Sequence, residues 1–136
     1  MIIVLDSNVI VAALAAHGLC QSVFELCLDQ HEIAISAQLL DEISAALRKE
    51  LKVPGERADE IVKFLENHGL VFKPVPLQVP VCRDPSDDRI LELAREAEAG
   101  FVVTGDEDIL ILDRFGSIPI VTPRQLWEQL KQQETR

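Results

Sequence analysis

The segment Ile2-Ile3-Val4-Leu5-Asp6, near the start of this 136-residue chain, joins four apolar residues to an acid that follows them directly. A second segment, Phe101-Val102-Val103-Thr104-Gly105-Asp106, repeats the pattern with its acid three residues after the apolar run. Short continuous apolar runs are typical of parallel strands that are covered on both faces. Because open α/β sheets bind ligands beyond the carboxyl ends of such strands, Asp6 and Asp106 are candidates for a functional site.

Strand and helix patterns alternate along the rest of the chain. A proline-rich connection at 71–83 separates two halves and leaves room for one short edge strand. This order predicts an α/β fold with a small, mostly parallel sheet in a single domain over residues 1–136. We expect strands at 2–5, 33–35, 101–104 and 118–121, and helices at 9–16, 21–30, 37–49, 54–68, 84–100, 109–112 and after 122–125.

Three helix boundaries carry specific expectations. Ser36 is a plausible N-cap for the helix at 37–49, and Asp84 with Pro85 behind it opens the helix at 84–100. Gly69 is expected to end the helix at 54–68 in the C′ position. These boundaries fix which residues lie at the ends of the predicted strands and helices.

The cysteines and the hydropathy pattern indicate the cellular compartment that we expect for the protein. Cys20, Cys27 and Cys82 are odd in number and show no metal-ligand spacing, which suits a reducing cytoplasm. Cys20 and Cys27 are expected to pack in the core. No apolar run approaches the roughly 20 residues needed to cross a bilayer, so we expect no membrane association.

The net charge of −10 constrains the partners of the protein. A strongly acidic surface repels phosphate backbones, so a nucleic-acid partner would need local basic groups or a bound cation. The basic residues near the candidate acids are Arg48, Lys49, Lys52, Arg83 and Arg89, for which solvated surface charge is the simpler role. Acidity does not exclude a nuclease, because several negative charges can themselves be metal ligands.

Further acids lie between the two strand ends. Glu42 lies among the apolar positions of the helix at 37–49, and Asp84, Asp87 and Asp88 open the next acidic helix. Taken singly, each has an ordinary explanation as a cap, a first-turn acid or a surface residue. Asp84 best fits the cap, and Asp87 is the preferred site acid with Asp88 in reserve. Asp108 is expected to cap the helix at 109–112, which would leave Asp106 without a structural role.

Several carboxylates in one crevice favour a divalent cation. Like-charge repulsion raises the pKa of such groups unless a cation lies among them. An all-oxygen ligand set suits Mg²⁺ or Mn²⁺, and the reaction class that uses such a site is phosphoryl transfer to water.

In their order and context, four segments resemble the PIN-domain (PilT N-terminus) family over nearly the whole chain. They are Asp6-Ser7-Asn8-Val9, Leu39-Leu40-Asp41-Glu42-Ile43, Asp84-Pro85-Ser86-Asp87-Asp88-Arg89-Ile90-Leu91 and Val103-Thr104-Gly105-Asp106-Glu107-Asp108. The likeness implies a PIN-like three-layer α/β/α fold and a Mg²⁺- or Mn²⁺-dependent ribonuclease. It also implies the toxin of a VapBC-type toxin-antitoxin pair, held inactive by a small antitoxin protein and commonly dimeric.

The resemblance also assigns roles to individual residues. Asp6, Glu42, Asp87 and Asp106 become the catalytic, metal-binding acids, with Asn8, Thr104, Asp108 and Asp88 as polar supports. Two other hypotheses stay open. One is a catalytically silent module that binds a protein or RNA, and the other is a phosphohydrolase in which Asp6 is a covalent nucleophile. The second is weaker, because Asn8 stands two residues after Asp6 and no glycine-rich phosphate loop is present.

Overall fold

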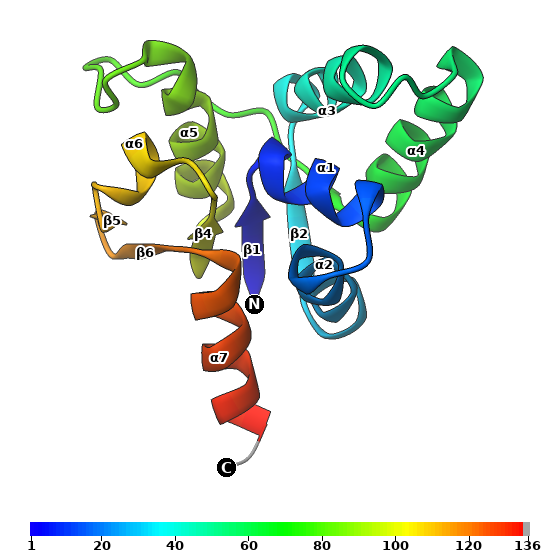
Figure 1. Ribbon diagram of the computed structural model, residues 1–136. Helices are drawn as coiled ribbons and strands as arrows, with labels where there is room; N and C mark the ends of the chain where they lie inside the picture. Colours follow the sequence, from blue (N-terminus) through cyan, green and yellow to red (C-terminus); the bar gives the residue numbers. More distant parts are fainter. Residues whose placement is uncertain (135–136) are drawn as a thin grey trace.

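A computed structural model describes residues 1–134 and contains one six-stranded sheet (Figure 1). The strand order is β3-β2-β1-β4-β6-β5, and all neighbours are parallel except β5 and β6. The predicted mostly parallel sheet is therefore confirmed. The strands are β1 (Ile2–Leu5), β2 (Glu32–Ile35), β3 (Leu70–Val71), β4 (Phe101–Val103), β5 (Arg114–Phe115) and β6 (Ile118–Val121).

Helices cover both faces of the sheet and produce the three-layer α/β/α arrangement. Helix α5 packs against β1, β2 and β4, whereas α2 and α7 pack against each other and against the strands (Figure 1). Helices α3 and α4 pack together beside β2 and β3. The helices are α1 (Ser7–Ala15), α2 (Leu19–Gln30), α3 (Ala37–Lys49), α4 (Gly55–His68), the 3₁₀ helix η1 (Pro85–Asp87), α5 (Asp88–Ala97), α6 (Glu107–Leu110) and α7 (Pro123–Glu134).

The central strand β1 explains why the apolar runs in the sequence are continuous. Ile3, Val4 and Leu5 are all fully buried, because side chains on both faces of this strand meet a helical layer. The same holds for Val102 and Val103 in β4, which pairs with β1. Burial on both faces makes β1 and β4 rigid supports for the residues that follow them.

The connection between β3 and η1 is held by acids of α5. Both carboxylate oxygens of Asp88 accept hydrogen bonds from backbone N–H groups of the connection, from Cys82 at 2.7 Å and Val81 at 3.1 Å. One turn later, Glu92 accepts from the N–H of Leu77 at 2.8 Å. Asp88 and Glu92 are each 2% exposed, so these bonds satisfy buried charges and fix the segment that leads to the site.

Some element boundaries differ from the sequence expectation. The predicted helix at 84–100 is divided into η1 and α5, although Asp84 does cap η1 by accepting from the N–H of Ser86 at 3.0 Å. The short antiparallel strand β5 was not predicted, because two residues give no readable alternation. Buried Cys27 and half-buried Cys20 pack with the core as expected.

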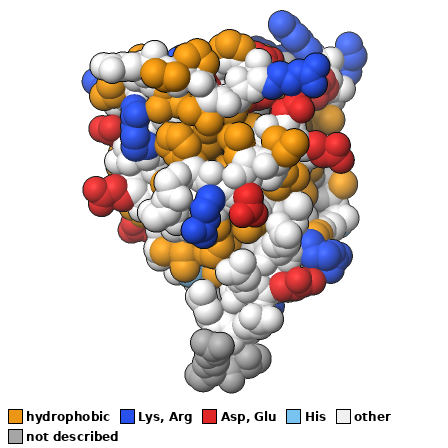
Figure 2. Space-filling model, turned by 90° about the vertical axis from the view of Figure 1, so that its left-hand side faces the viewer, with side chains coloured by type: hydrophobic (Ala, Val, Ile, Leu, Met, Phe, Trp, Pro, Cys, Tyr) orange, Lys and Arg blue, Asp and Glu red, His pale blue; other side chains and the backbone are white. Residues whose placement is uncertain are grey.

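Exposed apolar side chains occur beside the carboxyl edge of the sheet. Figure 2 shows hydrophobic side chains gathered on the face formed by α6, β5 and the connection before η1, with charged groups among and around them. On these elements, Ile111 is 81% exposed and Val79 is 74% exposed. This surface offers apolar contact area close to the acidic site.

Among the described residues, no single helix is long and apolar enough to cross a bilayer. Helices α1 and α2 meet those limits of length and composition only when they are joined, and their axes meet at a bend of 107°.

Gly69 ends α4 as predicted, but it is the C-cap residue, and its φ of −97° is ordinary extended backbone. A Cβ at this residue would lie 2.5 Å from Ile35 Cγ1 and 2.9 Å from the carbonyl oxygen of Leu65. Glycine is therefore needed because α4 turns into β3 in close contact with β2.

Gly69→Ala is expected to lower the free energy of unfolding by about 1–3 kcal/mol, because the added methyl overpacks backbone atoms that cannot move aside. Urea denaturation followed by circular dichroism measures this change. Gly18→Ala is the matched control, since a Cβ there meets nothing within 4 Å. An equal loss in both variants would contradict the steric explanation.

Candidate active site

Asp6 is held at the end of β1 by hydrogen bonds on both carboxylate oxygens. Oδ1 accepts from the N–H of Ser7 at 2.8 Å, and Oδ2 accepts from the Thr104 hydroxyl at 2.7 Å and the Asn8 amide at 3.1 Å. Asp6 is also the N-cap of α1, so the cap and the site position are compatible. Only 8% of Asp6 is exposed, and its orientation is fixed by its neighbours.

Thr104 and Asn8 join Asp6 to the turn that carries Asp106. The fully buried Thr104 hydroxyl donates to Asp6 and accepts from the N–H of Asp106 at 3.0 Å. Asn8 donates to Asp6 and accepts from the N–H of Gly105 at 3.1 Å. These two residues therefore hold the ends of β1 and β4 in a fixed relation.

Asp106 has a structural contact that the sequence did not predict. Its Oδ1 accepts from the N–H of Asp108 at 2.9 Å, so Asp106, not Asp108, is the N-cap of α6. The expected cap at Asp108 is wrong, because the helix begins two residues earlier than the apolar pattern indicates. Capping uses one carboxylate oxygen of Asp106 and leaves its charge near the other acids.

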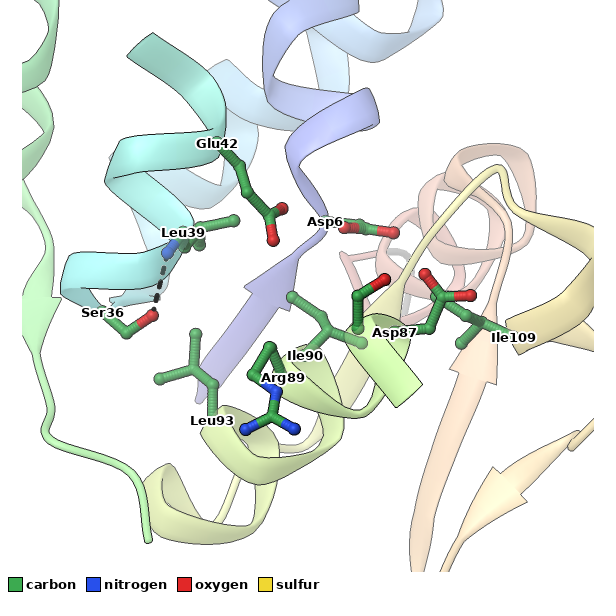
Figure 3. A pocket seen from close by; sticks show the side chains of 10 residues that line it. Asp6, Ser36, Leu39, Glu42, Asp87, Arg89, Ile90, Leu93 and Ile109 are labelled. Carbon is green, nitrogen blue, oxygen red and sulfur yellow. Dashed lines mark hydrogen bonds between the residues drawn. The ribbon is translucent and has the colours of Figure 1, made fainter. Parts of the chain in front are cut away.

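Glu42 and Asp87 reach the same pocket as Asp6 from α3 and η1. Figure 3 shows the Glu42 carboxylate pointing towards Asp6, with Asp87 on the neighbouring wall. The pocket has a volume of about 210 Å³. Its lining residues are Asp6, Ser36, Leu39, Glu42, Ser86, Asp87, Arg89, Ile90, Leu93 and Ile109.

Asp87 and Asp88, the two alternatives for the third acid, lie in different surroundings. Asp87 lines the pocket and is half-buried, whereas the carboxylate of Asp88 is buried beneath the connection and bonded to the N–H groups of Val81 and Cys82. Asp88 therefore supports the segment that carries Asp87 and lies outside the pocket lining. Adjacent residues differ in this way because η1 ends at Asp87 and α5 begins at Asp88.

Three of the site acids have raised pKa values. Desolvation by burial is the largest cause for Asp6, Glu42 and Asp87 alike. Like-charge repulsion adds to it: Asp106 raises the pKa of Asp6 and Asp87, and Asp6 and Asp87 both raise that of Glu42. The expected repulsion is present, but burial contributes more. The pKa values of Asp6, Glu42 and Asp87 are thus each raised in part by the charge of another site acid.

The donor chemistry of the site fits a hard divalent cation. One carboxylate oxygen from each of Asp87, Asp106 and Asp108 lies within 4.8 Å of the others, and Asp6 and Glu42 are electrostatically coupled to this group. Carboxylate oxygens are the ligands that Mg²⁺ and Mn²⁺ prefer. A bound cation would also offset the repulsion that raises the pKa values.

This fold and this set of acids define a PIN domain, and the PIN domain model matches residues 2–108. The chain belongs to the PIN domain family. A search of curated protein sequences finds no significant match.

Two solved structures have a similar fold. One is VapBC2 from Rickettsia felis bound to a DNA fragment from its promoter, with a TM-score of 0.63, 18% identity and coverage of 90% of this chain and 98% of that chain. The other is FitAB bound to an IR36 DNA fragment, with a TM-score of 0.59, 19% identity and coverage of 89% of this chain and 94% of that chain. At these identities the likeness establishes a shared fold.

Ser36 belongs to the pocket, which the sequence analysis did not recognise. It caps α3 as predicted, accepting from the N–H of Leu39 at 3.1 Å, and it also lines the acidic pocket. The available signal was its position, because Ser36 directly follows β2 as Asp6 directly follows β1. Polar residues after neighbouring parallel strands gather at one edge of the sheet.

Asp87→Asn is expected to stabilise the metal-free protein at pH 7. A carboxylate whose pKa is raised by folding binds more protons in the folded state, so stability falls as pH rises from the ordinary value of 3.8 through the raised one. Removing that charge should raise Tm by a few degrees at pH 7 in EDTA, with a smaller gain near pH 3.

Thermal denaturation of the wild type and Asp87→Asn at both pH values measures the difference. Asp41→Asn, an exposed acid on α3, is the control and should show no comparable gain at pH 7. A lower Tm for Asp87→Asn than for the wild type at pH 7 would contradict the electrostatic account.

Proposed function

We propose that the chain is a Mg²⁺- or Mn²⁺-dependent endoribonuclease that hydrolyses phosphodiester bonds at the carboxylate pocket. The observation that carries the proposal is that Asp6, Glu42 and Asp87 line one pocket at the carboxyl edge of the sheet, and that Thr104 joins Asp106 to Asp6 there. Membership of the PIN domain family supports the same activity.

The four acids would hold the metal. When bound, the divalent cation supplies a Lewis acid that lowers the pKa of water and offsets negative charge on phosphate oxygens. The chain contributes geometry: Thr104 and Asn8 hold Asp6 in one orientation, and the cap of α6 fixes Asp106. Prior orientation of the ligands lowers the entropy cost of assembling the site.

The walls of the pocket complement the acids. Leu39, Ile90 and Ile109 line it on several sides, so the carboxylates face a partly apolar surrounding. A low-dielectric surrounding strengthens the interaction between a bound cation and a phosphate. A single-stranded RNA segment, whose bases can be splayed out, is the substrate form that we expect at this pocket.

We further infer that this nuclease is the toxin of a toxin-antitoxin pair and binds a small antitoxin protein. Its fold matches VapBC2 and FitAB, whose names denote paired proteins. The exposed apolar side chains of Val79, in the connection before η1, and Ile111, directly after α6, offer contact area for such a partner. A homodimer is expected from the family resemblance, and the cytoplasm is the expected compartment.

Asp106→Asn should reduce RNA cleavage by roughly 10²-fold or more, because it removes a ligand charge. Asparagine can still cap α6, so the fold should be retained. Purified protein is incubated with single-stranded RNA in Mg²⁺, in Mn²⁺ and in EDTA, and the products are resolved by electrophoresis. Wild-type cleavage should require the metal.

Glu107→Gln is the matched control, since it removes an exposed neighbouring acid that is not part of the carboxylate group formed by Asp87, Asp106 and Asp108. It should cleave at close to the wild-type rate. Metal-independent cleavage, or intact RNA with the wild-type protein in millimolar Mg²⁺ and Mn²⁺, would contradict the proposed activity and favour a silent binding module.

Expression of the wild-type chain alone in a bacterial host should slow growth, while Asp106→Asn should not. Co-expression of a small protein encoded beside the gene should restore growth and co-purify with the chain. Growth curves and affinity purification from the same cultures provide the two measurements. Equal growth with wild type and variant at equal expression would argue against the toxin role.

A further inference from the structure

Arg89 is the one basic residue that lines the acidic pocket within the part of the chain that the structure describes. It lies in the first turn of α5, two residues after Asp87, and its side chain is 35% exposed. In Figure 3 its guanidinium points away from Asp6 and Asp87. The pocket therefore combines a group of acidic side chains with one basic side chain that points away from them.

The guanidinium is held in place by a buried acid. Nη1 of Arg89 lies 3.1 Å from Oε1 of Glu92, whose side chain is only 2% exposed. The other oxygen of Glu92 accepts from the backbone N–H of Leu77 at 2.8 Å. Because Glu92 is held on both oxygens, it orients Arg89 through this ion pair, and among the described residues the guanidinium has no other ion pair and no hydrogen bond.

We propose that Arg89 binds a backbone phosphate of the RNA next to the phosphodiester that is cut, with Glu92 as its positioning residue. The inference rests on the proposed nuclease function. A planar guanidinium with free N–H groups suits phosphate oxygens, and its fixed orientation reduces the entropy lost on binding. Since Arg89 points away from the acids, it meets a neighbouring phosphate instead of the one among the carboxylates.

The net charge of the chain makes the contact between Arg89 and a phosphate important for RNA binding. A chain with a net charge of −10 repels a polyanion, so productive binding needs a cation at the site itself. A purely structural role for Arg89, neutralising buried Glu92, predicts an effect on stability but none on the salt dependence of RNA binding. The two roles are therefore separable by experiment.

The test measures the affinity for a fluorescent single-stranded RNA by anisotropy in Mg²⁺, at several salt concentrations, in an Asp106→Asn background that blocks cleavage. Arg89→Gln should weaken binding about tenfold. The slope of log K against log salt should fall by about 0.7, the value for one phosphate contact on a single strand. Arg89→Lys should keep the slope because it keeps the charge.

Arg57→Gln is the matched control. Arg57 forms the same i, i+3 pair with Glu60 on α4, at 3.0 Å, but both side chains are 67% exposed and lie outside the pocket. Its loss should change neither the RNA affinity nor the salt slope. An effect as large as that of Arg89→Gln would overturn the proposal, because the change in net charge would then explain the loss of RNA affinity in both variants.

A double variant separates folding from binding. Arg89→Met with Glu92→Gln removes both charges, and the glutamine amide oxygen can still accept from Leu77. Its Tm should recover towards that of the background protein, while its RNA affinity should stay as low as that of Arg89→Gln. Recovery of affinity together with Tm, or an Arg89→Gln salt slope equal to that of the background, would overturn the proposal.

If the wild type does not cleave RNA but its binding still depends on Arg89, the nuclease proposal fails and the phosphate contact stands.

Discussion

The hydrogen bonds between Asp6 and the residues around it determine the geometry of the whole site. Thr104 and Asn8 bind the same oxygen of Asp6 and, through Asp106 and Gly105, the turn after β4. Buried strands on either side of this contact cannot shift without disturbing the core. The position of one carboxylate thus fixes the position of another that lies a hundred residues later in the chain.

A second constraint acts on the opposite wall of the pocket. Asp88 and Glu92 hold the connection before η1 against α5, and this connection leads directly to Asp87. Asp88 and Glu92, which are buried, therefore stabilise the fold, whereas the exposed or half-buried acids face the pocket. The protein tolerates this concentration of negative charge because backbone N–H groups satisfy the buried acids, whereas the pocket acids are left for a cation.

The sequence predicted the fold well, because fully buried strands such as Ile2–Leu5 have an unmistakable pattern. It also singled out Asp6, Glu42 and Asp87, which the structure brings to one pocket, although their metal-binding role stays a prediction. It preferred Asp87 to Asp88 for the site but placed the cap of the short helix at Asp108 instead of Asp106, because helix starts shift by one or two residues without changing the apolar period. The contact between Glu92 and Leu77 spans 15 residues and leaves no local signal.

If carboxylates from separate elements share one divalent cation, removing one of them should weaken the binding of that cation. We would titrate the metal-free protein with Mn²⁺ by isothermal titration calorimetry, using the wild type, Asp87→Asn and the exposed-acid control Glu107→Gln. We expect saturable binding for the wild type and the control and at least tenfold weaker binding for Asp87→Asn. Saturable binding of equal affinity in all three proteins, or none in the wild type, would contradict this expectation.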